Sequence, residues 1–157
     1  MDLTDLVFFH SHKIQMMFYP DAWRAADDTE LNWVVTDFPP VPRSEIPQSS
    51  GVYAFVVVPD LFSLYPANGL FYVGKATNLY NRIGAYISEN NKEFAKSKRP
   101  HIWKMLNQWE GCFKYYYSTT DNVTDAENIE IKLLNAFMPP FNKQYPAETS
   151  QIIRAFP

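Results

Sequence analysis

The hydrophobic positions of this chain follow a helical period in three segments. After Asn78 they recur at i, i+4, i+7 and i+8, and after Pro100 they recur at i, i+3, i+4 and i+7. The first pattern predicts a helix that begins at Thr77 or Asn78, and the second predicts a helix that Pro100 opens and Gly111 ends. A further apolar pattern predicts a helix over residues 124–137.

Runs of β-branched and aromatic residues predict three strands. GVYAFVVVP, residues 51–59, is continuously apolar, which is typical of a strand buried on both faces. LFYVGKA (70–76) and CFKYYYST (112–119) supply the other two. A Pro-Ala-Asn-Gly turn precedes the second strand, so the first two are expected to form an antiparallel hairpin with a long tip over residues 59–70. The predicted fold is of the α/β (α+β) class, a small, mainly antiparallel three-stranded sheet flanked by helices.

Residues 1–50 are interpreted as an extension packed on a domain of residues 51–157. Strand-like runs surround His10 and His12, a short helix followed by a strand is expected within residues 21–35, and DFPPVPRSEIP is a proline-rich connector. The two histidines point to the same side of a strand, where they either bind a metal ion or serve as ordinary surface or core residues. The second reading is favoured because neither a carboxylate nor a cysteine lies nearby in the sequence.

Composition indicates a soluble protein of a reducing compartment. The chain has 157 residues, of which 46% are hydrophobic, enough for a sizeable core. A single cysteine, Cys112, excludes an intramolecular disulfide. The N-terminus does not read as a signal peptide, and no apolar run is long enough to span a bilayer. We therefore expect a cytoplasmic protein without membrane partners.

The charge pattern limits how this chain can contact nucleic acid. A net charge of −3 has the wrong sign for broad adhesion to phosphate, so any such contact must be confined to a local basic patch. The chain has one basic cluster, formed by Lys92, Lys96, Lys98 and Arg99. The same cluster also fits a solvated surface stretch without a binding role.

Two groups of side chains carry candidate chemistry around the predicted hairpin. Arg82 falls at the edge of the apolar face of the helix after Asn78, one turn before Tyr86, where it either solvates or reaches an anionic ligand. Tyr53 and Tyr72 fall on one face of the hairpin if its register allows, with Gly74 leaving room beside them.

The helix over residues 124–137 carries a carboxylate in an unusual position. Thr124-Asp125-Ala126-Glu127 is read as a capping box, with Thr124 as the N-cap and Glu127 in a structural role. Glu130 is expected in the middle of the apolar side, where a carboxylate must be paired, hydrogen-bonded or bound to a metal. A buried salt bridge with Arg82 or a lysine and a functional metal ligand both remain open on these grounds. Beyond this helix, the break at MPPFN leaves Asn142 able to tie loop backbone together.

These residues together resemble the GIY-YIG nucleases over residues 51–142. GVY at 51–53 stands for the first signature triplet and YVG at 72–74 for the second. The remaining family positions follow in order: Lys75, Asn78-Leu79, Arg82, Tyr86, Glu130 and Asn142. The stretch from Glu130 to Asn142 is similar to that of the bacterial excision-repair members. One departure is the eighteen residues between Tyr53 and Tyr72, more than the family usually has.

The resemblance implies roles for these residues. It implies that Glu130 binds one Mg²⁺ or Mn²⁺ ion and that Arg82 clamps the phosphate. Tyr53 would act as general base or orient the water, with Tyr72 as a supporting phenol. Tyr86 would hydrogen-bond a phosphate oxygen or a metal-bound water. Lys75 is expected to lower the pKa of a neighbouring phenol by its charge. Lys96, Lys98, Arg99 and Asn142 are expected to contact the substrate.

The sequence thus predicts a metal-dependent endonuclease that hydrolyses phosphodiester bonds in nucleic acid, with DNA as the favoured substrate. A divalent ion and an arginine supply charge stabilisation that such hydrolysis requires. The alternative is a catalytically silent protein of the same fold that binds nucleic acid or another protein. The acidic composition favours the alternative slightly, whereas the complete set of Tyr53, Lys75, Arg82 and Glu130 favours the enzyme. The sequence carries no signal for an oligomeric state.

Overall fold

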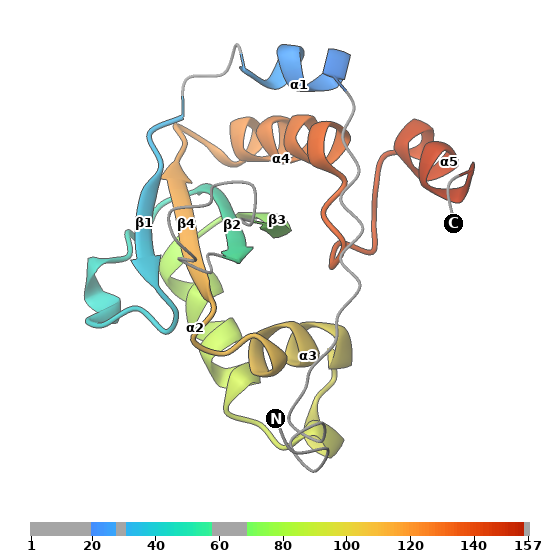
Figure 1. The fold of residues 1–157 in the computed structure, drawn as a ribbon. Coiled ribbons are helices and arrows are strands. Elements are labelled where there is room, and N and C mark those ends of the chain that lie inside the picture. The colour runs from blue at the N-terminus through green and yellow to red at the C-terminus, as the bar shows by residue number, and fades with distance from the viewer. Residues whose placement is uncertain (1–19, 28–30, 58–68, 156–157) are drawn as a thin grey trace, which may run out of the picture.

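The computed structural model describes residues 20–27, 31–57 and 69–155. These residues form an antiparallel four-stranded sheet with helices on both faces (Figure 1). The strands, in the spatial order β1-β4-β2-β3, are β1 (Val34–Asp37), β2 (Gly51–Val57), β3 (Gly69–Ala76) and β4 (Phe113–Thr119). The helices are α1 (Pro20–Asp27), α2 (Leu79–Asn90), α3 (Pro100–Gln108), α4 (Val123–Phe137) and α5 (Ala147–Ala155).

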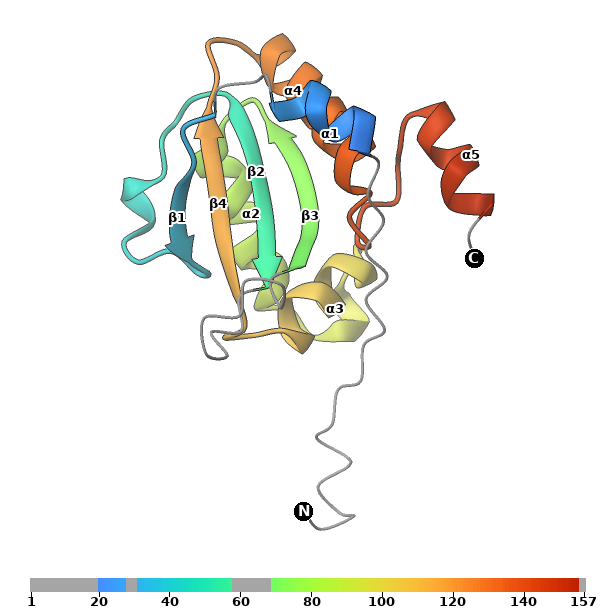
Figure 2. The same ribbon diagram turned by 45° about the horizontal axis from the view of Figure 1, so that its top comes forward.

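The structure confirms the α+β class and adds one strand to the predicted sheet. The helix and strand expected within residues 21–35 are present as α1 and β1. β1 pairs antiparallel with β4, placing Val34 opposite Tyr117, and thereby becomes an edge of the sheet. α1 lies against α4 (Figure 2). The runs around His10 and His12 lie outside the described residues.

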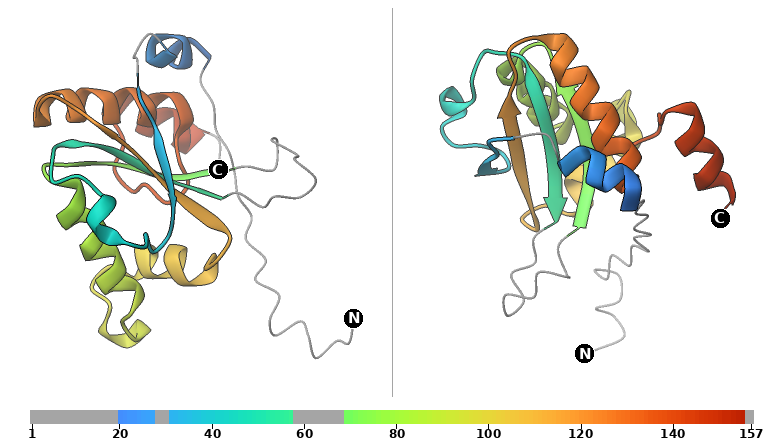
Figure 3. Two further views of the ribbon diagram at one scale, coloured as in Figure 1. Left: turned by 90° about the vertical axis from the view of Figure 1, so that its left-hand side faces the viewer. Right: turned by 90° about the horizontal axis from the view of Figure 1, so that it is seen from above.

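β2 is one of the two inner strands and is buried on both faces, as its apolar run predicts. On one face Tyr53 and Phe55 belong to the main core, which α2 and α3 complete. On the other face Ala54 packs with Val73 and with Leu134 of α4. Figure 3 shows α4 on one side of the sheet and α2 and α3 on the other. Because helices cover both faces, a continuous apolar strand is stable only in the middle of this sandwich.

The predicted hairpin of β2 and β3 is present and antiparallel. Tyr53 lies opposite Gly74, and Phe55 lies opposite Tyr72. The long tip of the hairpin lies outside the described residues. This pairing brings the two signature triplets side by side, although they are separated along the chain.

The start of α2 depends on the segment that precedes β2. α2 begins at Leu79, one residue after the later of the two predicted starts, and Asn78 is its N-cap, because its side chain accepts a hydrogen bond from the backbone N–H of Asn81. The N–H groups of Leu79 and Tyr80 donate to the carbonyls of Ser49 (2.9 Å) and Pro47 (3.1 Å). These backbone bonds fasten the connector before β2 to the first turn of α2.

The start of α4 differs from the prediction. α4 begins at Val123, and Asn122 is the N-cap, because its side chain accepts a hydrogen bond from the N–H of Asp125 at 2.9 Å. Thr124 is therefore not the N-cap, and the capping box does not form. Asn122 offers the same kind of side-chain acceptor two residues before Thr124, so the helix begins two residues earlier than predicted.

The remaining helices agree with the apolar patterns. α3 has Pro100 as its first residue and buries Ile102, Met105 and Leu106, and Gly111 after it has a positive φ of 75°. α5 extends away from the sheet beyond α4 (Figure 1). Within the described part of the chain, no helix is both long and apolar enough to cross a membrane.

Candidate active site

Three tyrosines from three elements form a cluster beside α2. Tyr53 comes from β2, Tyr72 from β3 and Tyr86 from α2. The phenol oxygens of Tyr53 and Tyr86 share a hydrogen bond of 2.9 Å. The ring of Tyr53 stacks on that of Tyr72 with 6.3 Å between centroids, which confirms that these two residues lie on one face of the hairpin.

The two glycines of the signature triplets allow close approaches that no other residue permits. A methyl carbon at Gly74 would lie 2.4 Å from the phenol oxygen of Tyr53. A methyl carbon at Gly51 would lie 2.3 Å from the carbonyl oxygen of Ser118 on β4. Gly74 therefore makes room for the phenol of Tyr53, as predicted, and Gly51 allows the close packing of β2 on β4.

The phenols of Tyr53 and Tyr72 are held in the neutral form. Burial raises the pKa of Tyr53 well above its ordinary value, and the neighbouring Tyr86 and Tyr72 raise it further, whereas Arg82 opposes them. Burial likewise raises the pKa of Tyr72. The pKa of neither Tyr53 nor Tyr72 is lowered on balance, so the effect expected of Lys75 on a neighbouring phenol does not prevail at either residue.

Lys75 instead connects β3 to α4. Its ammonium forms an ion pair with Glu127 at 2.5 Å, and this pair is partly exposed. Its backbone N–H donates a hydrogen bond of 3.1 Å to Oε1 of Glu130. Glu127 thus pairs with Lys75 of strand β3 rather than closing the capping box. The same lysine, directly after the second triplet, fixes the carboxylate of Glu130 through its backbone.

Glu130 is half-buried on the packed face of α4, one turn from the buried Ala126 and one turn from the buried Leu134, as the prediction placed it. The next residue, Ile131, is 41% exposed, so the packed face is narrower than expected. Burial raises the pKa of the Glu130 carboxyl, and the charges of Lys75 and Arg82 oppose that rise. Within the described residues Glu130 forms no salt bridge, so the structure does not support the buried ion pair that the sequence left open.

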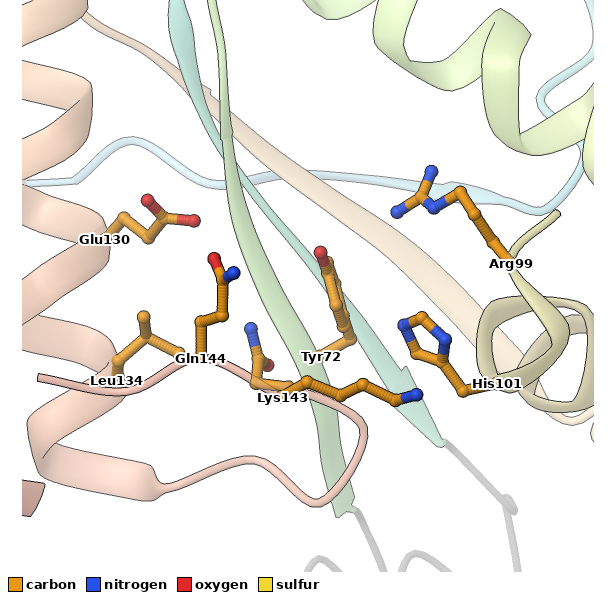
Figure 4. Close-up of a pocket in the computed structure, with 8 residues that line it drawn as sticks. Tyr72, Arg99, His101, Glu130, Leu134, Lys143 and Gln144 are labelled. Atoms are coloured by element: carbon orange, nitrogen blue, oxygen red, sulfur yellow. The ribbon is translucent and has the colours of Figure 1, made fainter. Parts of the chain in front are cut away.

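A cavity of about 330 Å³ opens beside these residues. Glu130 lies on one side of it, Tyr72 in the middle, and Arg99 on the other side (Figure 4). Tyr53 and Tyr86 lie behind Tyr72, in ring contact with it at 6.3 and 6.2 Å. Arg82 is exposed, and its charge acts on both Tyr53 and Glu130. Of the predicted catalytic residues, Tyr72 and Glu130 therefore line the cavity, while Tyr53 and Tyr86 are buried behind Tyr72.

Asn142 lies at the cavity but has its amide occupied. Its Oδ1 accepts from the N–H of Val73 at 3.0 Å, and its Nδ2 donates to the carbonyl of Val73 at 2.7 Å. These two bonds fasten the loop after α4 to the edge strand β3. Asn142 thus holds the loop after α4 against β3, as the sequence suggested. Its amide lies at the cavity with both polar atoms hydrogen-bonded to Val73.

The basic cluster is divided between paired and cavity-facing residues. Lys92 forms an ion pair with the buried Glu89 at 2.7 Å, and the exposed Lys96 pairs with Glu93 at 2.9 Å. Arg99 turns toward the tyrosines, with its guanidinium 5.2 Å from the centre of the Tyr86 ring. Lys96 and Lys98 are exposed and do not line the cavity.

Two further residues of the cavity were not identified from the sequence. His101 on the first turn of α3 and Lys143 directly after Asn142 both line it (Figure 4). The signals were present in the sequence, as a histidine that follows the basic cluster and a lysine beside a family position. Their proximity is a tertiary feature that no local pattern predicts.

The carboxylate of Glu130 fits the role of a single metal ligand. Its Oε1 is held by Lys75, while Oε2 has no hydrogen-bond partner within the described residues. Across the described ranges no three His, Cys, Asp or Glu side chains gather in one place. A hard divalent cation that keeps several waters needs only one or two carboxylates, so Mg²⁺ or Mn²⁺ matches this donor set better than a multi-ligand zinc site does.

Comparison with known proteins identifies the family. The model of the GIY-YIG catalytic domain matches residues 51–143, which is more than half of the chain. This chain belongs to the GIY-YIG family. The match includes the two triplets, Arg82, Glu130 and Asn142, so the GIY-YIG catalytic domain contains the cavity and the residues around it.

The relatives of this GIY-YIG chain are longer proteins. UvrABC system protein C of Helicobacter hepaticus is 32% identical over 111 residues, which cover 66% of this chain and 16% of that protein. The protein of the same name from Mycoplasma genitalium is 32% identical over 85 residues, 54% of this chain and 13% of that protein. The matched segment thus spans less than a fifth of the length of either relative.

A solved structure is also similar to this GIY-YIG chain. It is the N-terminal GIY-YIG endonuclease domain of UvrC from Thermotoga maritima, bound to magnesium, its catalytic divalent cation. The two chains are 20% identical with a TM-score of 0.46, and the match covers 64% of this chain and 90% of that domain.

Proposed function

We propose that this chain is a metal-dependent endonuclease that hydrolyses phosphodiester bonds in nucleic acid, with DNA as the favoured substrate. The observation that supports it best is the position of Glu130, whose carboxylate is fixed by the backbone of Lys75 at the side of an open cavity. Tyr72 lines the same cavity, and the charge of Arg82 acts on Glu130. Membership in a family of catalytic domains adds the expectation of activity.

One Mg²⁺ or Mn²⁺ ion, held by Glu130, is proposed as the cofactor. Such an ion, when bound, polarises a phosphoryl oxygen and stabilises charge on it. The chain's part is to hold the carboxylate in place, since Oε1 accepts from Lys75 and Oε2 is left to face a ligand. The half-buried setting also strengthens the attraction between this carboxylate and a cation relative to water.

The tyrosines are proposed to orient water rather than to exist as phenolates. Because burial raises the pKa of both Tyr53 and Tyr72, each phenol carries its proton at neutral pH. A protonated phenol still accepts a hydrogen bond from water through its lone pairs and donates one to a phosphate oxygen. Tyr86 supports this arrangement, because it shares a hydrogen bond with Tyr53.

Arg82 is proposed as the clamp on the scissile phosphate. Its planar guanidinium matches two phosphate oxygens at once, and its exposed position leaves it accessible to a large substrate. Lys96, Lys98 and Arg99 are proposed to contact the sugar-phosphate backbone of the nucleic acid, and of the three only Arg99 lines the cavity. We further propose that residues 51–157 form the nuclease domain and that residues 1–50 form an extension packed on it, an arrangement that the pairing of β1 with β4 supports.

Incubation with labelled nucleic acids tests this function directly. Single-stranded, duplex and branched DNA and the corresponding RNAs are each incubated with Mg²⁺, Mn²⁺ or EDTA. We expect cleavage of at least one DNA substrate with either metal and none with EDTA. Binding without cleavage under all metal conditions would instead favour the catalytically silent alternative.

A further inference from the structure

The cavity beside Glu130 has two sides of opposite character. Glu130 lies at one side, and three basic or imidazole groups lie at the other (Figure 4). Those three are Arg99, His101 and Lys143. We call them the cationic wall, and the resemblance to known nucleases assigned no role to His101 or Lys143.

Two separate pieces of the chain build this wall. Arg99 is the N-cap of α3, His101 belongs to its first turn, and Lys143 lies in the loop between α4 and α5. Hydrogen bonds between Asn142 and the backbone of Val73 hold that loop against β3, which keeps Lys143 at the cavity. The wall is therefore set by the fold and not by one mobile segment.

The cationic wall has no acidic partner within the described residues. None of its three members takes part in an ion pair there, whereas Lys92 and Lys96 of the same basic cluster are both paired. The first turn of α3 also contains no acidic residue. Burial lowers the pKa of His101, and the charges of Lys143 and Arg99 lower it further, which reflects their mutual repulsion. An anion between these groups would relieve that repulsion.

The cationic wall lies on the side of the cavity away from Glu130 (Figure 4). The scissile phosphate belongs near Glu130 and Tyr72 under the proposed function, which leaves the far side of a cavity of about 330 Å³ to another group. Consecutive phosphates of a nucleic acid strand follow each other at regular spacing. The neighbouring phosphate of the same strand therefore has the charge and the chain connection that the far side of the cavity would match.

We propose that Arg99, His101 and Lys143 form a second phosphate subsite, which binds the backbone phosphate next to the scissile one. This inference rests on the proposed function and adds to it the positioning of the strand. Phosphate contacts fix register without reading sequence. The subsite therefore positions the scissile bond against Glu130, and it requires the strand to continue beyond the cleavage point on that side.

Binding measurements in EDTA with charge-deleted substrates test the subsite. Wild type, His101→Gln, Lys143→Gln and Lys143→Arg are titrated with labelled oligonucleotides in which one linkage at a time is a neutral methylphosphonate. Lys104→Gln is the matched control, because Lys104 lies on the same helix, is exposed, and faces the ring of Phe94 at 5.8 Å instead of the cavity. Thermal unfolding of each variant shows that it is folded.

The subsite predicts a specific coupling between protein and substrate. One methylphosphonate position should weaken binding by wild type roughly fivefold to tenfold and should have little further effect in Lys143→Gln or His101→Gln. Lys143→Gln should also reduce the salt slope of binding by about one, while Lys143→Arg and Lys104→Gln stay close to wild type. With metal present, KM should rise in the two Gln variants of the wall while kcat changes little.

Two results would overturn the subsite. One is that the two Gln variants of the wall bind every oligonucleotide as tightly as Lys104→Gln does. The other is that inorganic phosphate competes at the wall while no methylphosphonate position matters, which would mean a site for free phosphate. Because binding is measured without cleavage, a failure of the nuclease activity itself is read separately, from wild type with Mg²⁺ or Mn²⁺.

Discussion

Gly74 lies directly against the phenol of Tyr53, across the pairing of β3 with β2. A methyl carbon at Gly74 would come within 2.4 Å of the Tyr53 oxygen, the atom that also bonds to Tyr86. The glycine of the second triplet therefore determines where the tyrosine of the first triplet can lie. The two triplets act as one unit, because one supplies the ring and the other supplies the space for it.

Gly74→Ala should displace Tyr53 and reduce turnover strongly. Overpacking of this kind costs about 1–3 kcal/mol of stability, and Tyr53→Phe, which keeps the ring but removes the oxygen, should reduce turnover roughly 100-fold. Gly69→Ala on the same strand is the control, since its nearest atom would be 3.9 Å away. Cleavage rates and thermal unfolding check this, and a Gly74→Ala enzyme of normal turnover would contradict the assigned position of Tyr53.

Two variants separate the ion pair of Lys75 with Glu127 from its proposed role in catalysis. Lys75→Met and Glu127→Gln each remove the same partly exposed ion pair, so each should cost less than about 1 kcal/mol of stability. If Lys75 also contacts substrate or metal-bound water, only Lys75→Met should lower kcat. Steady-state kinetics of the pair decide this. Equal kinetics for the two variants would restrict Lys75 to a structural role.

Arg82→Lys should reduce turnover more than binding. Lysine keeps the charge but lacks the planar fork that contacts two phosphate oxygens, so we expect kcat to fall roughly 100-fold and the dissociation constant to change little. Arg82 is exposed, and the variant should fold normally. Single-turnover rates and binding in EDTA provide the measurements. Unchanged turnover would show that only the positive charge matters at this position.

Much of this fold follows from local sequence patterns. The apolar run of β2 and the helical periods of α2 and α3 are predicted correctly because neighbouring residues determine them, and the start of α2 is predicted to within one residue. The N-cap of α4 was predicted wrongly because Asn122 and Thr124 are both good caps, and only the observed bond from Asp125 to Asn122 separates them.

The parts of the site that sequence reasoning missed are non-local. β1 joins the sheet through a pairing with β4 some eighty residues later in the chain, and no pattern within Val34–Asp37 specifies that partner. Lys75 was expected near a phenol, but its ammonium reaches Glu127 on α4. His101 and Lys143 meet at one cavity only because α3 and the loop after α4 converge there.

Wild type should be less stable at neutral pH than the variant Glu130→Gln. Burial raises the pKa of the Glu130 carboxyl in the folded state, so its ionisation destabilises the fold at a pH above that pKa. This destabilisation vanishes once the pH falls below the pKa that the same carboxyl has in the unfolded chain. Without metal, Glu130→Gln should therefore raise the unfolding temperature at about pH 8 and leave it unchanged at about pH 4. Gln retains the acceptor for Lys75. A variant that is less stable at about pH 8 would contradict this assignment.

The central claim is that Glu130 holds the metal ion required for cleavage. Glu130→Gln and Glu127→Gln make the same chemical change on one helix, three residues apart, and only Glu130 lies at the cavity. We expect wild type and Glu127→Gln to cleave a labelled DNA with Mg²⁺ and to be stabilised by Mn²⁺ in thermal unfolding. Glu130→Gln, though folded, should lose roughly 1000-fold in turnover and gain no stability from Mn²⁺. Cleavage by Glu130→Gln at the rate of Glu127→Gln would contradict the account.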